Sequence, residues 1–309
     1  MAGKRKTNSK PGRSGRIALC SFLALLATFM LLAGVSALNA GIVRVRRAEV
    51  ELADLPESFD GTSILYASDI DLCGTNTAQK CGALFRRLQS LHPDILLLGG
   101  DYTSVPLLEY LNRAENSPSD NVTGLARRSD FFQYIASFEA PVGKFAIAAP
   151  EDPDWENLSL LMTQSGVHPL FNDRTALHSG GSTLWLAGIC SESAGLNGAG
   201  SAFHRGDCVV AAAYSPQVLP LLLTSEAIDG GQWADLMLCG HTHGGQVRLF
   251  GKSALALTPQ EQDIPAGWTV SGSLPILVTQ GLGCEGLNLR LGSQPEVWLI
   301  TLRRARFPR

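Results

Sequence analysis

Residues 17–43 form an uninterrupted stretch without a charged side chain, and no other feature constrains the chain as strongly. About 20 apolar residues suffice to cross the hydrocarbon core of a bilayer, and this stretch is longer. A cleaved signal peptide is the alternative, since the small residues at 35–37 resemble a cleavage site, but signal peptides have an apolar core of about 7–15 residues. The sequence therefore predicts a membrane anchor over 17–43, a basic tail over 1–16 and one domain over 44–309.

Charge is distributed unevenly around this stretch. Six of the 25 Lys and Arg residues lie in residues 1–43, and all 28 Asp and Glu residues follow them. Cytoplasmic flanks of membrane spans are rich in Lys and Arg. We therefore predict a single-pass membrane protein with a cytoplasmic N-terminus and an extracytoplasmic domain.

The predicted domain keeps 19 basic against 28 acidic residues, a net charge of −9. An acidic surface repels nucleic acids and anionic lipid surfaces, because both present phosphate. We expect no nucleic-acid binding, and phosphate chemistry in this domain would need a cation.

Six cysteines remain in the domain after Cys20, which lies in the predicted anchor. An even number agrees with export to an oxidising compartment. Cys73–Cys81 and Cys190–Cys208 are the locally plausible disulfides, and buried free thiols are the alternative, because spacing alone does not fix connectivity.

Short apolar runs bounded by Gly, Pro, Asp or Ser predict mostly buried strands, and helical patterns lie between several of them. The predicted strands are 63–67, 95–98, 144–148, 183–187, 209–213, 236–239, 275–279 and 296–302, and the predicted helices are 78–91, 130–138, 154–164 and 217–223. The polar segment 112–128 predicts an exposed loop. This alternation is typical of an α/β layer architecture.

Acidic or histidine residues follow four of the predicted strands, where α/β proteins bind ligands. They are Asp69 and Asp71 after 63–67, Asp101 after 95–98, Glu151 and Asp152 after 144–148, and His241 and His243 after 236–239. A single Asp at a strand end is more often a helix cap or turn residue. Carboxylates and imidazoles at four strand ends together predict a metal centre, because a divalent cation removes the repulsion between buried carboxylates.

Three sequence runs resemble the calcineurin-like metallophosphoesterases, in particular their membrane-associated bacterial members. The runs are Ser-Asp-Ile-Asp-Leu at 68–72, Gly-Gly-Asp at 99–101 and Leu-Cys-Gly-His-Thr-His-Gly-Gly-Gln-Val-Arg-Leu at 238–249, with further similarity at 55–61, 279–283, 289–291 and 295–297. The resemblance covers about 44–303, and its Gly-His-Thr-His-Gly-Gly-Gln run is specific. It implies an αββα sandwich of two mixed β-sheets flanked by helices, here preceded by one transmembrane helix.

The resemblance also implies a pair of divalent metals at the strand ends, with attack of metal-bound hydroxide on phosphorus. It assigns Asp69 and His243 to the first metal and His241 to the second. Asp101 would bridge both metals and thus belong to the catalytic machinery.

Three segments depart from the family pattern. Asp71 stands where the family has His, and an oxygen ligand favours a harder ion such as Mn²⁺ or Mg²⁺. Pro150 stands where the family has an Asn ligand, and Glu151 replaces a His that helps to neutralise the phosphoryl or leaving oxygen. Tyr214 replaces another His ligand. Glu151 is therefore the predicted catalytic residue beside Asp101, and Glu151 and Tyr214 are the candidate substitutes in the second site.

Two functions remain open from the sequence. The first is a membrane-tethered phosphoesterase that uses one or two divalent metals, Mn²⁺ being favoured over Mg²⁺, Fe²⁺ and Zn²⁺, on a phosphoester at the membrane or cell envelope. The second is a catalytically impaired member of the same fold that serves as a binding or scaffold module, because three segments of the site carry substitutions.

Overall fold

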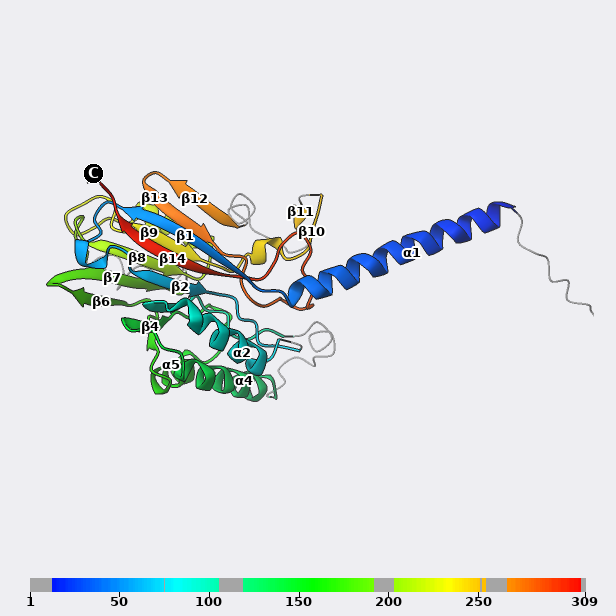
Figure 1. The fold of residues 1–309 in the computed structure, drawn as a ribbon, viewed down its shortest axis with the longest axis horizontal. Helices are drawn as coiled ribbons and strands as arrows, with labels where there is room; N and C mark the ends of the chain where they lie inside the picture. The colour runs from blue at the N-terminus through cyan, green and yellow to red at the C-terminus, as the bar shows by residue number, and fades with distance from the viewer. Residues whose placement is uncertain are drawn as a thin grey trace, which may run out of the picture.

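Two mixed β-sheets packed face to face and flanked by helices make up the domain, and helix α1 projects from it (Figure 1). The computed structural model describes residues 13–74, 76–105, 119–191, 203–250, 252–253 and 266–306. The helices are α1 (Arg13–Ala40), α2 (Ala78–Leu88), α4 (Ser119–Ala136), α5 (Trp155–Gln164) and α6 (Leu219–Thr224), with short 3₁₀ turns at Glu57–Phe59, Gln89–Leu91, Pro216–Val218 and His243–Gly245.

The first sheet has the strand order β1-β14-β2-β3-β4-β5, and the second has the order β12-β13-β9-β8-β7-β6. The strands of the first are β1 (Arg44–Leu52), β2 (Ser63–Ala67), β3 (Ile95–Leu98), β4 (Gly143–Ala146), β5 (His168–Pro169) and β14 (Glu296–Arg304). Those of the second are β6 (Arg174–Ser179), β7 (Ser182–Ile189), β8 (Cys208–Ala213), β9 (Leu236–Cys239), β12 (Gly267–Ser271) and β13 (Leu274–Val278). A separate hairpin pairs β10 (Arg248–Leu249) with β11 (Lys252–Ser253).

Parallel pairing brings the predicted site loops to one end of the sandwich. β2, β3, β4 and β5 are parallel to one another, and so are β7, β8, β9 and β13. The carboxyl ends of parallel strands share one edge of a sheet, where ligands bind. The predicted sandwich of two mixed sheets with flanking helices is confirmed.

Apolar side chains from both sheets form the core. All residues of β3 and β8 are buried, as expected for parallel strands covered on both faces. Helix α2 packs its apolar side against this core, and the Thr77 side chain caps its start by accepting a hydrogen bond from the Lys80 backbone nitrogen at 3.3 Å. Helix α2 also packs against α4.

The prediction of an exposed loop over 112–128 is wrong for residues 119–128, because α4 begins at Ser119. Residues 112–118 lie outside the described part of the chain. Gly124 and Arg128 are buried on the same face of α4 as Phe131, Phe132 and Ile135. A glycine and an arginine do not register as apolar residues, so the sequence does not reveal the helical periodicity.

Helix α1 contains the one stretch among the described residues, Leu19–Ala40, that is long and apolar enough to cross a membrane by length and composition. Its end contacts the domain. The backbone nitrogen of Arg290 donates to the Ser36 carbonyl at 2.9 Å, and the Gln294 side chain donates to Asn39 Oδ1 at 3.5 Å. The loop between β13 and β14 thus lies beside the last turns of α1.

The cysteine pairs that the sequence allows are free thiols in the structure. β7 and β8 pair with Leu184 opposite Cys208, whereas Cys190 follows the far end of β7. Six residues of extended chain span roughly 20 Å, far beyond the Cα separation of about 7 Å that a disulfide tolerates. The Cys81 thiol instead donates to Asn76 Oδ1 at 3.4 Å, and the Cys73 thiol faces the Cys284 carbonyl.

Candidate metal centre

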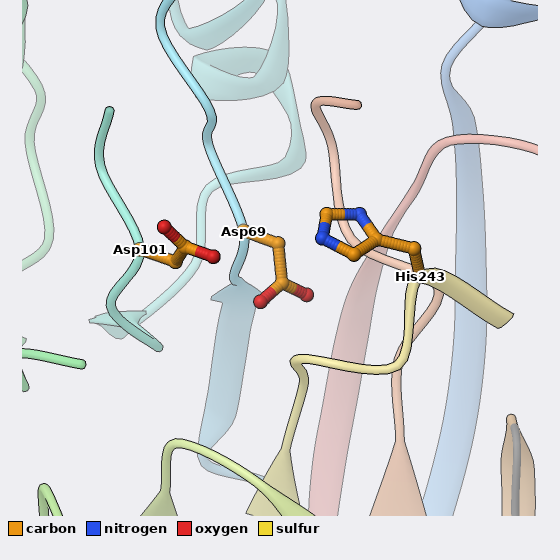
Figure 2. A group of neighbouring side chains, drawn as sticks. All are labelled: Asp69, Asp101 and His243. Carbon is orange, nitrogen blue, oxygen red and sulfur yellow. The ribbon is translucent and has the colours of Figure 1, made fainter. Parts of the chain in front are cut away.

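Three loops from both sheets bring Asp69, Asp101 and His243 together (Figure 2). Asp69 follows β2, Asp101 follows β3 and His243 follows β9. One potential ligand atom from each side chain lies within 4.8 Å of those of the other two. Asp69 and His243 are buried, and Asp101 keeps part of its surface accessible. Solvent and a substrate would therefore reach the cluster on the side of Asp101.

The backbone at all five predicted metal ligands has a positive φ angle. The values are 50° at Asp69, 46° at Asp71, 56° at Asp101, 72° at His241 and 49° at His243. Residues other than glycine rarely adopt this left-handed region, and each instance costs about 1–3 kcal/mol. Such strain gathers at functional sites, because the surrounding structure enforces a geometry that the local chain does not favour.

Close packing fixes the Asp69 carboxylate. Its Oδ1 accepts a hydrogen bond from the His241 backbone nitrogen at 2.8 Å, and its Oδ2 accepts one from the Ser68 hydroxyl at 2.9 Å. A Cβ atom on Gly281 would lie 2.5 Å from Asp69 Oδ2, and Gly281 has a φ of +69°. Only glycine fits this position, since both its conformation and the free space exclude a side chain.

Asp71 is buried without a hydrogen-bond partner. Neither of its carboxylate oxygens has one among the described residues, and its Oδ2 lies 3.5 Å from His243 Nε2. Burial raises the pKa of Asp71 well above its usual range, and the Asp69 charge raises it further. An ionised carboxylate is costly to bury unless a cation compensates for its charge.

The other carboxyls share this electrostatic problem. Burial, followed by the charges of Asp71 and Asp152, raises the pKa of Asp101 well above its usual range. Burial also raises the pKa of Asp69, although hydrogen bonds from His241 and Ser68 oppose the shift. Several acidic groups thus crowd one buried region, which is the arrangement that a divalent cation stabilises.

Arg290 orients the His243 ring from behind. Its side chain is fully buried, and its Nη1 donates to the carbonyls of His243 and Gln280 at 2.7 Å each. Its Nη2 lies 3.2 Å from His243 Nδ1. On the other side of the ring, His243 Nε2 lies 3.5 Å from Asp71 Oδ2. Burial, together with the Arg290 charge, lowers the pKa of His243 well below its usual range, so the imidazole is neutral.

These residues fit a divalent cation. Asp69, Asp101 and the neutral His243 form a group of two carboxylates and one imidazole that could hold a metal ion, and the unpartnered carboxylate of Asp71 lies next to this group, 3.5 Å from His243 Nε2. Carboxylate-rich ligand sets suit Mn²⁺ or Mg²⁺, whereas Zn²⁺ is typically bound by thiolates and imidazoles.

No family model matches the chain. The uncharacterized metallophosphoesterase YkuE of Bacillus subtilis (strain 168) is 26% identical over 259 residues, which cover 81% of this chain and 82% of that protein. The phosphodiesterase YaeI of Escherichia coli (strain K12) is 28% identical over 213 residues, 68% of this chain and 70% of the relative. The Bos taurus transmembrane protein with metallophosphoesterase domain is 24% identical over 313 residues, 95% of this chain and 64% of that protein.

These relatives confirm the predicted resemblance to the calcineurin-like metallophosphoesterases. Metallophosphoesterases use divalent metals, and the cluster around Asp69 is a suitable place for one.

The residues predicted to hold a second metal do not join this cluster. His241 is half-buried, and its side chain does not join the cluster of Asp69, Asp101 and His243 among the described residues. Its ring instead packs edge-on against Tyr214, with ring centroids 5.7 Å apart. Pro150 and Glu151 are exposed in the turn after β4, and the Glu151 charge contributes to the raised pKa of Asp101. The predicted roles of His241, Glu151 and Tyr214 stay predictions.

Two residues that support the cluster are not among the predicted site residues. Asp152 is buried and accepts hydrogen bonds from the backbone nitrogens of Asp101, Tyr102 and Ala149 at 2.8–2.9 Å, which fixes the Asp101 loop. Arg290 is the other. In the sequence, Asp152 is one more acidic residue at a strand end, but nothing there connects Arg290 to a histidine 47 residues earlier.

Proposed function

We propose that this chain is a membrane-tethered, metal-dependent phosphoesterase. In this proposal, 1–16 is a cytoplasmic tail, 17–43 is a single-pass anchor and 44–309 is an extracytoplasmic catalytic domain. The length and composition of α1 support the anchor, as does the likeness to a protein named a transmembrane protein with metallophosphoesterase domain. The concentration of basic residues before the anchor supports the orientation.

The observation that carries the proposal is Asp71, a buried carboxylate with two unpartnered oxygens beside Asp69, Asp101 and His243. We propose that these four residues hold one divalent cation. When bound, a cation there supplies Lewis-acid polarisation of a phosphoryl oxygen and activation of water. The proposal places one metal rather than two in the site, since Pro150 has no ligand atom and His241 packs against Tyr214.

The remaining residues position this centre. Ser68 and the His241 backbone fix the two oxygens of Asp69, and Arg290 fixes the His243 ring. Asp152 fixes the loop that carries Asp101, the ligand on the accessible side. A phosphoester would approach from that side, where His241 and Glu151 are also accessible. We propose a substrate at the membrane surface, because the loop that carries Arg290 also contacts α1.

The test is hydrolysis by the full-length protein in detergent micelles. Chelated protein is supplied with Mn²⁺ and assayed with p-nitrophenyl phosphate and bis-p-nitrophenyl phosphate. We expect Mn²⁺-dependent turnover that Asp101→Asn abolishes and Asp130→Asn retains, since Asp130 is an exposed residue of α4. Metal binding without turnover of either ester would reject the enzyme in favour of the catalytically impaired binding module. Equal turnover in Asp101→Asn and parent would reject the assignment of the ligands.

A further inference from the structure

A cavity lies at the junction between α1 and the domain. Its volume is about 310 Å³, at the lower end of the range for small-molecule sites. One wall is formed by the end of α1 and the segment that follows it, including Ala40 and Val43, and another by α2. Asn288, in the loop that contacts α1, completes the lining.

The cavity is basic although the domain as a whole is acidic. Lys80 and Arg87 both line it, seven residues apart on one face of α2, with Leu84 between them. Asn76 and Asn288 add amide groups, and none of the described lining residues is acidic. Two cations with amide donors form a suitable environment for a phosphate group.

The position of the cavity favours a lipid over a free phosphate. The apolar stretch of α1 ends at Ala40, which is itself a lining residue, so the cavity begins where the proposed span leaves the hydrocarbon. Arg290 contacts Ser36, four residues earlier in α1 and therefore about 6 Å deeper along the helix axis. The loop that carries Arg290 and forms one wall thus extends past the level at which the proposed span leaves the hydrocarbon.

Two exposed apolar side chains are adjacent in sequence to lining residues of the cavity. Ile42 is 55% exposed and Leu287 is 47% exposed, and each is adjacent in sequence to a lining residue. Exposed apolar side chains at the level of a membrane surface are positioned to contact acyl chains. A soluble phosphate compound would gain nothing from them.

We propose that this cavity, lined by Lys80 and Arg87, binds the phosphate head group of an anionic phospholipid in the leaflet on the domain side. The proposal rests on the proposed membrane anchor but not on hydrolysis. Asn76 connects the cavity to the loop that carries Asp69, because its side chain lines the cavity and donates to the Ile70 carbonyl at 2.6 Å. The bound lipid would thus fix the orientation of the domain, with its metal centre next to the membrane surface.

The test is native mass spectrometry of the full-length protein released from neutral detergent micelles in the presence of EDTA. Phosphatidylglycerol, phosphatidylcholine and glycerol 1-phosphate are titrated separately. We expect one phosphatidylglycerol per chain, bound at least tenfold more tightly than the other two. The double variant Lys80→Gln/Arg87→Gln should bind it roughly 30-fold more weakly, since each basic residue near an anionic surface contributes about fivefold.

The control variant Arg86→Gln/Arg205→Gln removes the same charge outside the cavity and should bind as the parent does. Arg86 lies over the Tyr134 ring on another face of α2, and Arg205 precedes β8. Ala83→Trp fills the cavity without a change of charge and should also abolish binding. Equal binding of both lipids, equal losses in the two double variants, or tight binding of glycerol 1-phosphate would overturn the proposal. Because EDTA is present, these outcomes are independent of any failure of hydrolysis.

Discussion

Removal of the Asp71 charge should have opposite effects without and with a divalent metal. In Asp71→Asn, the buried carboxylate that has no hydrogen-bond partner becomes a neutral amide with two donors. The amide no longer carries the charge that the Asp69 carboxylate repels, and it keeps the position 3.5 Å from His243 Nε2. The metal-free variant should therefore be more stable than the parent, whereas a metal should stabilise it less.

The magnitudes follow from the burial of Asp71. An unsatisfied buried polar group costs about 1–3 kcal/mol, so metal-free Asp71→Asn should gain about that much, or roughly 2–6 °C in Tm for a domain of this size. At a Mn²⁺ concentration of about 100 times its Kd, the parent gains about 2.7 kcal/mol. If loss of the ligand weakens binding about 100-fold, the variant gains only about 0.4 kcal/mol.

The assay is thermal unfolding of the full-length protein in micelles at pH 7.5, followed by tryptophan fluorescence in EDTA and in Mn²⁺. Asp152→Asn is the matched control, because Asp152 already accepts three backbone hydrogen bonds. This control should lower Tm in both conditions. The reasoning is refuted if Asp71→Asn lowers Tm in EDTA, or if the Mn²⁺-induced rise in Tm is as large in the variant as in the parent.

Two further predictions concern the supporting residues. Arg290→Lys and Arg290→Gln should each weaken Mn²⁺ binding about 10–100-fold, because lysine keeps the charge but not the planar group that orients His243. Calorimetric titration measures this binding, and parent-like binding in Arg290→Lys would exclude the geometric role. Burial raises the pKa of Asp152 to about 6 from 3.8, so the folded state holds this proton longer than the unfolded state. The stability that protonated Asp152 contributes is therefore fully present below about pH 4 and is lost as the pH rises through about 6. In metal-free protein this loss lowers the free energy of unfolding by about 3 kcal/mol. Urea unfolding in EDTA at pH 5 and 7.5 should show this decline, which should be smaller in Asp152→Asn; a parent that becomes more stable at higher pH would contradict it.

Much of the fold is predictable from sequence, because parallel strands covered on both faces are short apolar runs with clear boundaries. β3 and β9 coincide with the predicted strands 95–98 and 236–239. β1 is absent from the predicted strands, since five of its nine residues are charged, most of the strand is exposed, and it is held at the edge of the sheet by pairing with β14. The predicted helix over 130–138 is shorter than α4 because buried Arg128 does not fit an apolar pattern.

Some residues of the candidate site are also predictable from sequence, whereas others depend on the folded loops. Asp69, Asp101 and His243 each come within a few residues of the end of an apolar strand, so the amino-acid sequence is sufficient to group them. The orientation of His241 towards Tyr214 depends on a left-handed backbone conformation at His241, which no pattern of residues specifies. The contact between Arg290 and His243 depends on how the loop after β13 folds back over the loop after β9.

The most direct test of the central claim is the number of metal ions per chain. Full-length protein in micelles is loaded with Mn²⁺, freed of excess metal by gel filtration, and analysed for metal and protein content. We predict one Mn²⁺ per chain in the parent and less than a tenth of that in Asp69→Asn and in His243→Ala. Two ions per chain would contradict a single-metal centre, and no retained metal, or retention unchanged by either variant, would contradict the site itself.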